Sequence, residues 1–408
     1  MHTLLALALL LAGGDGSTPL HWAVYNDDAE TAARLIRTGA GVNAANDLGV
    51  TPLWIASQNG STALVETLLK AGANPNAALL SGETPVMVAS RAGFSEIVEL
   101  LAARGGNVNA RAARGQTALM WAVAQKHPDT VKVLLAHGAD VHARSAVWSQ
   151  MMAVPPHGYP EYNRMIPQGG DTALMFAARV GDLASAKLLV DGGADVNDHD
   201  AWGVSATVLA AHSGYREVVQ YLLDHGADPN MAGAGFTALH EAIMRRDEKM
   251  VGALLEHGAD PNAPLRTWTP TRRSSHDFHF EPALVGATPF WLAARFQQPE
   301  VMRLLVERGA DPRIVHRSEY VTGGRYEKHI ETTTALMAAT GMGGGSAWVD
   351  APRREREALT LETVKLAIEL GAEIDTANTD GRTALDAAQA LGYESVVNFL
   401  LSKGARRR

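Results

Sequence analysis

The 408-residue sequence contains no cysteine, so disulfide bonds and thiol chemistry are excluded. It also lacks an excess of basic residues, since the formal net charge is −8. Nucleic-acid-binding domains carry a concentrated basic patch, whereas only short basic clusters occur here, at 272–273, 353–356 and 406–408. Such short clusters are typical of solvated surface charge, so we expect no nucleic-acid partner.

The usual signatures of catalysis are missing as well. There is no H-E-x-x-H zinc motif and no G-x-S-x-G nucleophile turn. The glycine-rich run at 341–346 resembles a phosphate-binding loop, but it lacks the lysine of that motif and follows a predicted helix rather than a strand. The sequence therefore predicts a protein that is not an enzyme and that uses no cofactor.

What the sequence does contain is a fixed internal distance. A threonine or serine that can open a helix is followed 21 residues later by a glycine that can close the next one. The pairs are Thr18/Gly39, Thr51/Gly72, Thr84/Gly105, Thr117/Gly138, Thr172/Gly193, Ser205/Gly226, Thr237/Gly258, Thr288/Gly309 and Thr383/Gly404. A tenth pair, Thr334/Gly371, encloses 16 extra residues. Self-similarity at about 33 residues indicates a solenoid, whose stacked units form an extended binding surface.

Residues 16–48 show what one unit encodes. Thr18 can cap a helix, because its hydroxyl can accept a hydrogen bond from a free backbone N–H. Pro19 fits the first helical position, where a missing N–H costs nothing. Gly39 can take the left-handed conformation that ends a second helix, and a polar, turn-rich segment follows. Each unit is therefore predicted to be a helix, a tight turn, a second helix and an extended finger.

These residues resemble the ankyrin repeat. Residues 18–23 read TPLHWA and residues 237–242 read TALHEA, close to the pattern T-P-L-H-x-A, while 226–230 and 258–262 both read GADPN. The resemblance implies an all-α ankyrin-repeat solenoid of about ten helix-turn-helix units with β-turn or hairpin fingers. It also implies a concave binding face lined by fingers and first helices, and we expect a bacterial source.

The period predicts the domain organisation, with three insertions that extend fingers and one that separates paired helices. Repeats 1–4 span 15–144, repeats 5–7 span 170–263, repeat 8 spans 286–313, and repeats 9–10 span 333–408. The finger insertions are 145–169, 264–285 and 314–332, and the insertion inside repeat 9 is 341–359. The array is expected to behave as one elongated domain and as a monomer.

The three finger insertions are rich in aromatic residues, which are common in binding hot spots. Because they extend fingers on one edge, we expect them to form a wall beside the concave face. We therefore predict a protein-interaction scaffold that binds a partner protein there. The candidate partner-binding residues are Trp54, Trp121, Trp148, Tyr159, Tyr162, Trp268, Phe278, Phe280, Trp291, Tyr320 and Tyr326.

Two alternatives stay open. His276 and His279, with neighbouring carboxylates, are the weak candidates for a metal site or a small-molecule site in the second insertion. In an extended strand, however, side chains three apart point to opposite faces, so no metal is favoured. A self-assembling structural module is the third hypothesis, because the last helix shows the apolar pattern of an internal one.

The first residues have two interpretations. Leu4–Ala12 is an unbroken apolar run, too short to span a bilayer as a helix but similar to the core of a secretory signal. Residues 1–14 are therefore predicted to be a signal peptide or anchor, which would make the protein periplasmic or secreted. The other interpretation is the second helix of a preceding repeat, in a cytoplasmic protein.

Overall fold

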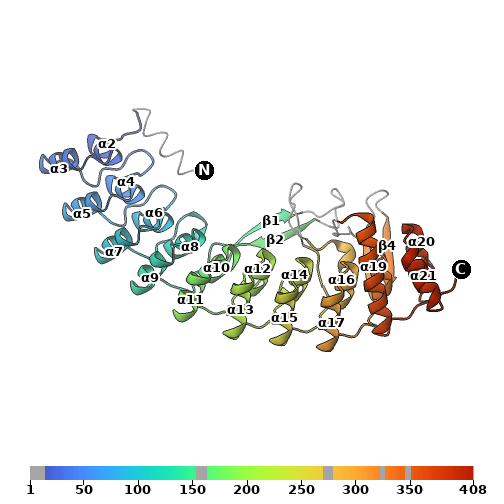
Figure 1. The fold of residues 1–408 in the computed structure, drawn as a ribbon. Helices are drawn as coiled ribbons and strands as arrows, with labels where there is room; N and C mark the ends of the chain where they lie inside the picture. The colour runs from blue at the N-terminus through green and yellow to red at the C-terminus, as the bar shows by residue number, and fades with distance from the viewer. Residues whose placement is uncertain (1–13, 153–162, 270–278, 322–326, 345–350, 408) are drawn as a thin grey trace. The chain divides into compact units, whose positions relative to one another are not determined.

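The structure is a computed structural model, and it describes residues 14–152, 163–269, 279–321, 327–344 and 351–407. Its contacts divide the chain into two compact units. Unit 1 comprises 1–148 with 169–201, and unit 2 comprises 149–168 with 202–408. Within each unit, Figure 1 shows helices in pairs that follow one another in chain order. The prediction that the whole array behaves as one domain stays a prediction.

Unit 1 contains five helix pairs and one short 3-10 turn among its described residues. The elements are α2 (Pro19–Tyr25), α3 (Ala29–Arg37), α4 (Pro52–Asn59), α5 (Thr62–Lys70), α6 (Pro85–Ala92), α7 (Ser95–Ala103), η1 (Ala113–Gly115), α8 (Ala118–Ala124), α9 (Pro128–Ala136), α10 (Ala173–Val180) and α11 (Leu183–Asp191).

Unit 2 contains the remaining helix pairs and two small two-stranded sheets, of which β3–β4 is antiparallel. Its helices are α12 (Ala206–Ser213), α13 (Arg216–Asp224), α14 (Ala238–Met244), α15 (Glu248–Glu256), η3 (Pro282–Leu284), α16 (Pro289–Arg295), α17 (Pro299–Glu307), α18 (Ala335–Ala339), α19 (Arg353–Glu369), α20 (Ala384–Leu391) and α21 (Glu394–Ser402). Its strands are β1 (Trp148–Met152, whose first residue belongs to unit 1), β2 (Arg164–Gln168), β3 (His316–Val321) and β4 (Lys328–Thr333).

The predicted helix starts and ends are confirmed in all ten repeats. Each helix-opening threonine or serine occupies the N-cap of the first helix of its repeat, from Thr18 before α2 to Thr383 before α20. Each helix-closing glycine has a positive φ, as at Gly39 (91°) and Gly258 (87°). Only glycine adopts this backbone conformation without strain, so the 21-residue spacing reflects capping at both ends.

Small residues let the first helices pack closely. The alanine five positions after each helix start is buried in every repeat, for example Ala56, Ala210 and Ala388. The recurrent methionines Met87, Met120, Met175 and Met337 are buried as well. The repeat position that they share is therefore a core position.

Neighbouring repeats are also joined by a ladder of asparagine side chains in the fingers. The amide of Asn76 donates to the carbonyl of Gly105 (2.9 Å), and its oxygen accepts from the backbone N–H of Asn107 (2.7 Å). The same pair of bonds recurs at Asn43, Asn109, Asn230 and Asn262. Each amide therefore satisfies the end of one helix pair and positions the finger beyond it.

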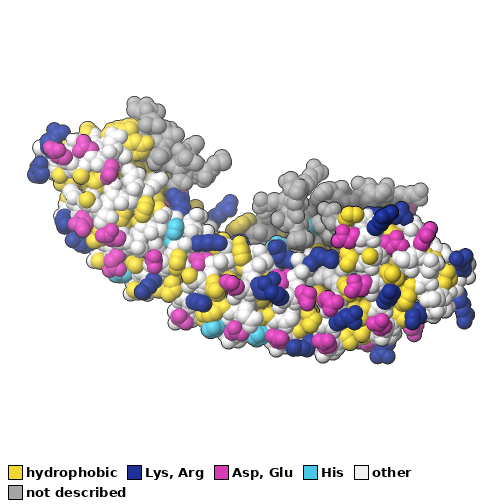
Figure 2. All heavy atoms as spheres, viewed as in Figure 1, with side chains coloured by type: hydrophobic (Ala, Val, Ile, Leu, Met, Phe, Trp, Pro, Cys, Tyr) yellow, Lys and Arg dark blue, Asp and Glu magenta, His cyan; other side chains and the backbone are white. Residues whose placement is uncertain are grey.

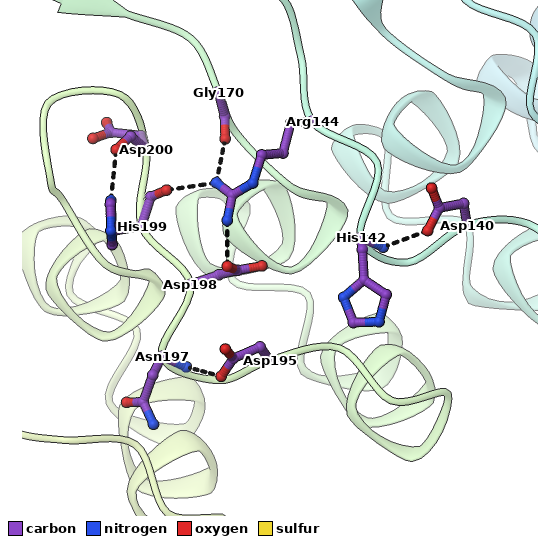
Figure 3. A network of polar contacts seen from close by, with 9 residues as sticks. All are labelled: Asp140, His142, Arg144, Gly170, Asp195, Asn197, Asp198, His199 and Asp200. Atoms are coloured by element: carbon purple, nitrogen blue, oxygen red, sulfur yellow. Dashed lines mark hydrogen bonds and ion pairs between the residues drawn. The ribbon is translucent and has the colours of Figure 1, made fainter.

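The ladder changes where the first insertion begins, because the asparagine position holds His142. Arg144, two residues on, makes the connection instead. Its guanidinium donates to the carbonyls of Gly170 (3.0 Å) and His199 (2.7 Å) and pairs with Asp198, as Figure 3 shows. The base of the first finger is thereby tied to the next finger within unit 1.

The second and third fingers contact each other in unit 2. The 3-10 turn η3 packs against β3, and the carbonyl of Val285 lies 3.1 Å from Nε2 of His316. The described end of the first finger joins them, since the Arg164 guanidinium lies 5.1 Å from the centre of the Trp268 ring. Among the described residues, the first insertion therefore contacts the second, and the second contacts the third.

The fourth insertion differs from its predicted form. The sequence analysis gave 341–359 as an insertion between the helices of repeat 9, but α19 begins at Arg353 and continues to Glu369. Residues 353–359 therefore lengthen the second helix rather than form a connector. No arginine or glutamate in this stretch breaks a helix, which explains the extension.

The N-terminal prediction lies mostly outside the described residues, since these start at Gly14. None of the helices that the structure describes has the length and apolarity that a membrane crossing requires.

The asparagine ladder generates the first prediction. The substitution Asn76→Ala removes two hydrogen bonds between repeats and should lower the free energy of unfolding by about 1–3 kcal/mol. Urea denaturation measures the change. Gln125→Ala is the control, because Gln125 is exposed at the end of α8 and surface changes usually stay within about 0.5 kcal/mol. Equal effects of the two substitutions would contradict the role of the ladder.

The buried histidine of the T-x-L-H motif generates the second prediction. In unit 2, Nδ1 of His240 lies 2.9 Å from the Thr237 hydroxyl and Nε2 lies 3.1 Å from the Ala263 carbonyl. Burial lowers the pKa of His240 to about 4. The unfolded chain, with a histidine pKa near 6.5, therefore binds a proton that the folded chain excludes between these two pH values.

Stability that is complete above pH 6.5 should consequently fall as the pH drops towards 4, by about 3 kcal/mol from this one group. His240→Gln should flatten that part of the pH profile, because glutamine does not titrate. Urea titrations at pH 7, 6, 5 and 4 provide the measurement. An unchanged slope in the variant would show that other groups cause the acid sensitivity.

Candidate protein-interaction surface

In unit 1, arginine side chains lie over partly exposed aromatic rings at three places. The Arg91 guanidinium lies 4.9 Å from the centre of the Trp121 ring, and the Trp121 indole N–H donates to the Gln116 side chain (3.2 Å). Trp121 projects from α8, where it follows the T-A-L-M start of that helix. Trp121 is partly exposed.

The second place is Trp148, at the start of the first finger. The Arg114 guanidinium, in the η1 turn of the preceding finger, lies 5.2 Å from the centre of the Trp148 ring. Trp148 keeps 40% of its surface exposed. The two fingers are held together below these side chains, because the Ala146 N–H donates to the Arg114 carbonyl (2.6 Å).

The third place is Phe176 on α10. The Arg179 guanidinium lies 5.6 Å from the centre of the Phe176 ring and pairs with the Asp171 carboxylate at 2.7 Å. Asp171 in turn bonds Ser145, at the base of the first finger. These contacts link the second and third places through the base of the first finger. We call Arg91, Arg114, Arg179, Trp121, Trp148 and Phe176 the arginine–aromatic surface.

This surface is locally basic although the chain is acidic. Arg111 and Arg144 lie beside it, because a guanidinium nitrogen of Arg111 donates to the Arg144 carbonyl. On the face drawn in Figure 2, acidic and basic side chains are intermingled. A guanidinium over an aromatic ring contributes about 0.5–1 kcal/mol at an exposed site and more once water is excluded, so covering this surface would strengthen its contacts.

Four of the predicted partner-binding residues are buried, which corrects their assignment. Trp54 and Trp291 are each 1% exposed, and Trp268 and Phe280 are also in the core. Phe280 packs in unit 2 against Phe236 and His240, and the Trp291 indole N–H donates to the Thr333 hydroxyl (3.2 Å). Because these four side chains are buried, they cannot contact a partner.

The other predicted residues divide into three groups. Trp121 and Trp148 lie on the arginine–aromatic surface, and Tyr320 is half-buried on β3 in unit 2. The remaining four fall outside the described residues: Tyr159, Tyr162, Phe278 and Tyr326. Sequence reasoning missed Phe176 and the arginines, although Phe176 occupies the same repeat position as Trp121, four residues after the helix-opening threonine.

The metal hypothesis receives no support from the described residues. His276 lies outside them, and Nε2 of His279 is 3.9 Å from the Glu281 carboxylate, with no third ligand grouped with this pair. Across the described ranges, no three histidine, cysteine, aspartate or glutamate side chains come together in a metal-binding arrangement.

Comparison with known families identifies the fold. A model described as ankyrin repeats in three copies matches residues 3–79, 73–145 and 174–264. A second, described as ankyrin repeats in many copies, matches 119–190, and a single-repeat model matches 285–317 and 380–407. These matches cover more than half of the chain, so the chain belongs to the ankyrin repeat family. Ankyrin repeats generally mediate protein–protein interaction and are generally not enzymes.

Similar proteins match over limited lengths. The chain is 37% identical over 90 residues to rat "Ankyrin repeat and SAM domain-containing protein 6", covering 22% of this chain and 10% of the relative. It is 37% identical over 95 residues to bovine "Mitochondrial disaggregase", covering 23% and 13%. It is 30% identical over 245 residues to "Ankyrin repeat and KH domain-containing protein CBG24701" of Caenorhabditis briggsae, covering 60% and 9%.

The matched segments thus span only about a tenth of these relatives, which limits what the relatives imply about the chain as a whole. All three come from animals, so they give no support to the expected bacterial source.

Proposed function

We propose that this chain is a non-catalytic scaffold that binds a partner protein through the arginine–aromatic surface of unit 1. The observation that carries the proposal is the series of guanidinium groups over partly exposed rings on first helices and fingers. Tryptophan and arginine are the residues most enriched in binding hot spots. A stack of capped helices holds them in place before binding, which lowers the ordering cost.

The composition of the surface indicates the chemistry of the partner. The arginines outnumber the carboxylates bonded to them. Among the described contacts, Asp171 pairs with Arg179 of the surface, and Asp198 pairs with the neighbouring Arg144. A complementary segment would carry acidic side chains beside apolar ones, so that carboxylates meet guanidinium groups and apolar atoms cover the ring edges. The first helices and fingers are the elements expected to form the concave face.

The monomeric state and the location of the protein stay part of the proposal. A secreted or periplasmic location follows if residues 1–14 act as a signal, and a cytoplasmic one follows otherwise. A scaffold that binds a partner protein requires no metal or cofactor. No observation on the described residues favours self-assembly over partner binding.

Two substitutions on the surface test the proposal. Affinity capture from the native source first identifies a partner, which is then purified, and calorimetry measures its Kd for each variant. Trp148→Ser and Arg114→Glu should each weaken binding at least tenfold, because a hot-spot side chain contributes about 2 kcal/mol or more. The Kd should also rise with ionic strength, since screening weakens attraction between exposed charges.

Lys132→Glu is the matched control, because it makes the same charge change as Arg114→Glu on the exposed side of α9. All variants must keep the helical circular-dichroism spectrum of the parent chain. Equal weakening by Lys132→Glu would indicate a nonspecific charge effect. If both surface variants bind the partner with full affinity, the binding site lies elsewhere. The proposal that the arginine–aromatic surface binds the partner would then be wrong.

A further inference from the structure

Unit 2 contains a pocket of about 350 Å³ beside the third finger. Three segments far apart in sequence form its walls. They are the end of the β3–β4 hairpin, the glycine-rich loop after α18, and the last finger with the adjoining side of α20. Ligand pockets in proteins typically start at about 300 Å³, so this space suits a small molecule.

A buried polar network forms one wall. The Glu331 carboxylate accepts from the Tyr320 hydroxyl (3.2 Å) and from the Asn378 amide (3.1 Å). Glu331 is only 7% exposed, and Arg295, also buried, donates to the Gly344 carbonyl (3.2 Å). Burial and the neighbouring Glu331 raise the pKa of Tyr320 above its ordinary value, so the hydroxyl keeps its proton and can hold this geometry.

The glycine-rich loop is shaped to fit against this wall. Gly344 has φ 68°, and a Cβ there would lie 2.8 Å from the Tyr320 hydroxyl oxygen. Gly343 has φ 103°, and a Cβ there would lie 2.4 Å from the Trp291 ring. Both positions therefore need glycine for conformation and for space. The run that resembled a phosphate loop in the sequence thus lines a pocket, although it lacks that motif's lysine.

Two opposite charges stand on the last finger. Asp380 and Arg382 both line the pocket, two residues apart, and both are exposed. Asn378 fixes this turn, because its side-chain oxygen accepts from the N–H groups of Asp380 (3.1 Å) and Arg382 (2.8 Å). His329 lies near Asp380, at 3.9 Å between Nε2 and the carboxylate. Arg382 has no ion pair with any described residue.

Part of the remaining lining is apolar, beside Thr340 and Gly341. Met342, Ala387, Ala390 and Leu391 contribute hydrocarbon surface, and Leu391 keeps 43% of its own surface exposed. The pocket therefore offers an anionic group, a cationic group and an apolar patch. A ligand with one charge would leave the opposite charge of the finger unmatched, whereas a ligand with both charges can satisfy both.

We propose that this pocket binds a small zwitterion of the α-amino-acid type, with its ammonium group at Asp380, its carboxylate at Arg382 and its side chain on the apolar patch. Arginine and carboxylate form two parallel hydrogen bonds, which fixes orientation as well as charge. Tyr320, Glu331 and Asn378 act as positioning residues, because they hold the hairpin and the finger in register. The site is independent of the partner-binding proposal.

Calorimetry and ligand-observed NMR on the full chain test the proposal with three matched probes. Leucine carries both charges, leucinamide carries only the ammonium group, and N-acetylleucine carries only the carboxylate. Leucine should bind saturably and at least tenfold more tightly than either of the other two. This comparison also separates a free amino acid from the terminus of a peptide, since each peptide terminus presents one of the two charges.

Two variants assign the contacts. Arg382→Gln should weaken leucine at least tenfold and leave leucinamide unchanged, and Asp380→Asn should weaken leucine and leave N-acetylleucine unchanged. Arg354→Gln is the control, because it removes an exposed arginine at the start of α19. It should leave leucine binding unchanged. Because the substituted side chains are exposed, the variants should keep the parent circular-dichroism spectrum.

Several results would overturn the proposal. A leucine concentration of about 10 mM fills most of a site with a millimolar Kd. If leucine shows no saturable binding up to that concentration, the proposal is wrong. Leucinamide binding as tightly as leucine would replace the zwitterion with a cation or a peptide N-terminus. Unchanged leucine binding in both variants would place the ligand outside this pocket.

Discussion

The asparagine amide that joins one finger to the next repeat is the interaction on which the array depends. Each repeat is too small to bury a sufficient core alone, so its stability comes from its neighbours. Apolar packing between helices supplies most of this stabilisation but is not directional. The paired bonds at Asn43, Asn76 and Asn109 add direction, because one amide engages both a helix-closing carbonyl and the following backbone N–H. They set the register in which each finger projects.

Departures from this ladder mark where the chain acquires other structure. The position holds His142 before the first insertion and Arg313 before the third, whereas Asn262 keeps its two bonds beside the second. Asp375 keeps half of the interaction, since its carboxylate accepts from the Arg406 N–H (3.0 Å) but cannot donate. At the first insertion Arg144 replaces the amide with a longer reach (Figure 3). The first finger is thus tied down at its base.

The sequence predicted those features that local chemistry determines. Helix starts at threonine, helix ends at glycine and buried alanines all follow from capping, backbone conformation and side-chain size within one repeat. Burial of the aromatic residues depends instead on contacts distant in sequence. Trp291 is covered because β3 folds back over it, with the His316 ring 4.1 Å away, and no pattern within α16 reveals that hairpin. The Arg91–Trp121 contact likewise joins residues of different repeats, so it could be found only in the structure.

The third finger shows why a polar inner face is evidence for a role beyond packing. Its residues alternate along β3, and His316, Ser318 and Tyr320 face inward opposite Thr333, Glu331 and His329. Burying such groups costs free energy even when they are hydrogen-bonded, and apolar residues of similar size often stabilise a fold better. The second finger achieves its packing with Phe280 and Trp268, which shows that an apolar solution suits this array. The polar face of the third finger has two parts. His316 and Thr333 bond protein groups that hold the hairpin against η3 and α16, whereas Tyr320, His329 and Glu331 border the pocket, where the proposed ligand needs fixed donors and acceptors.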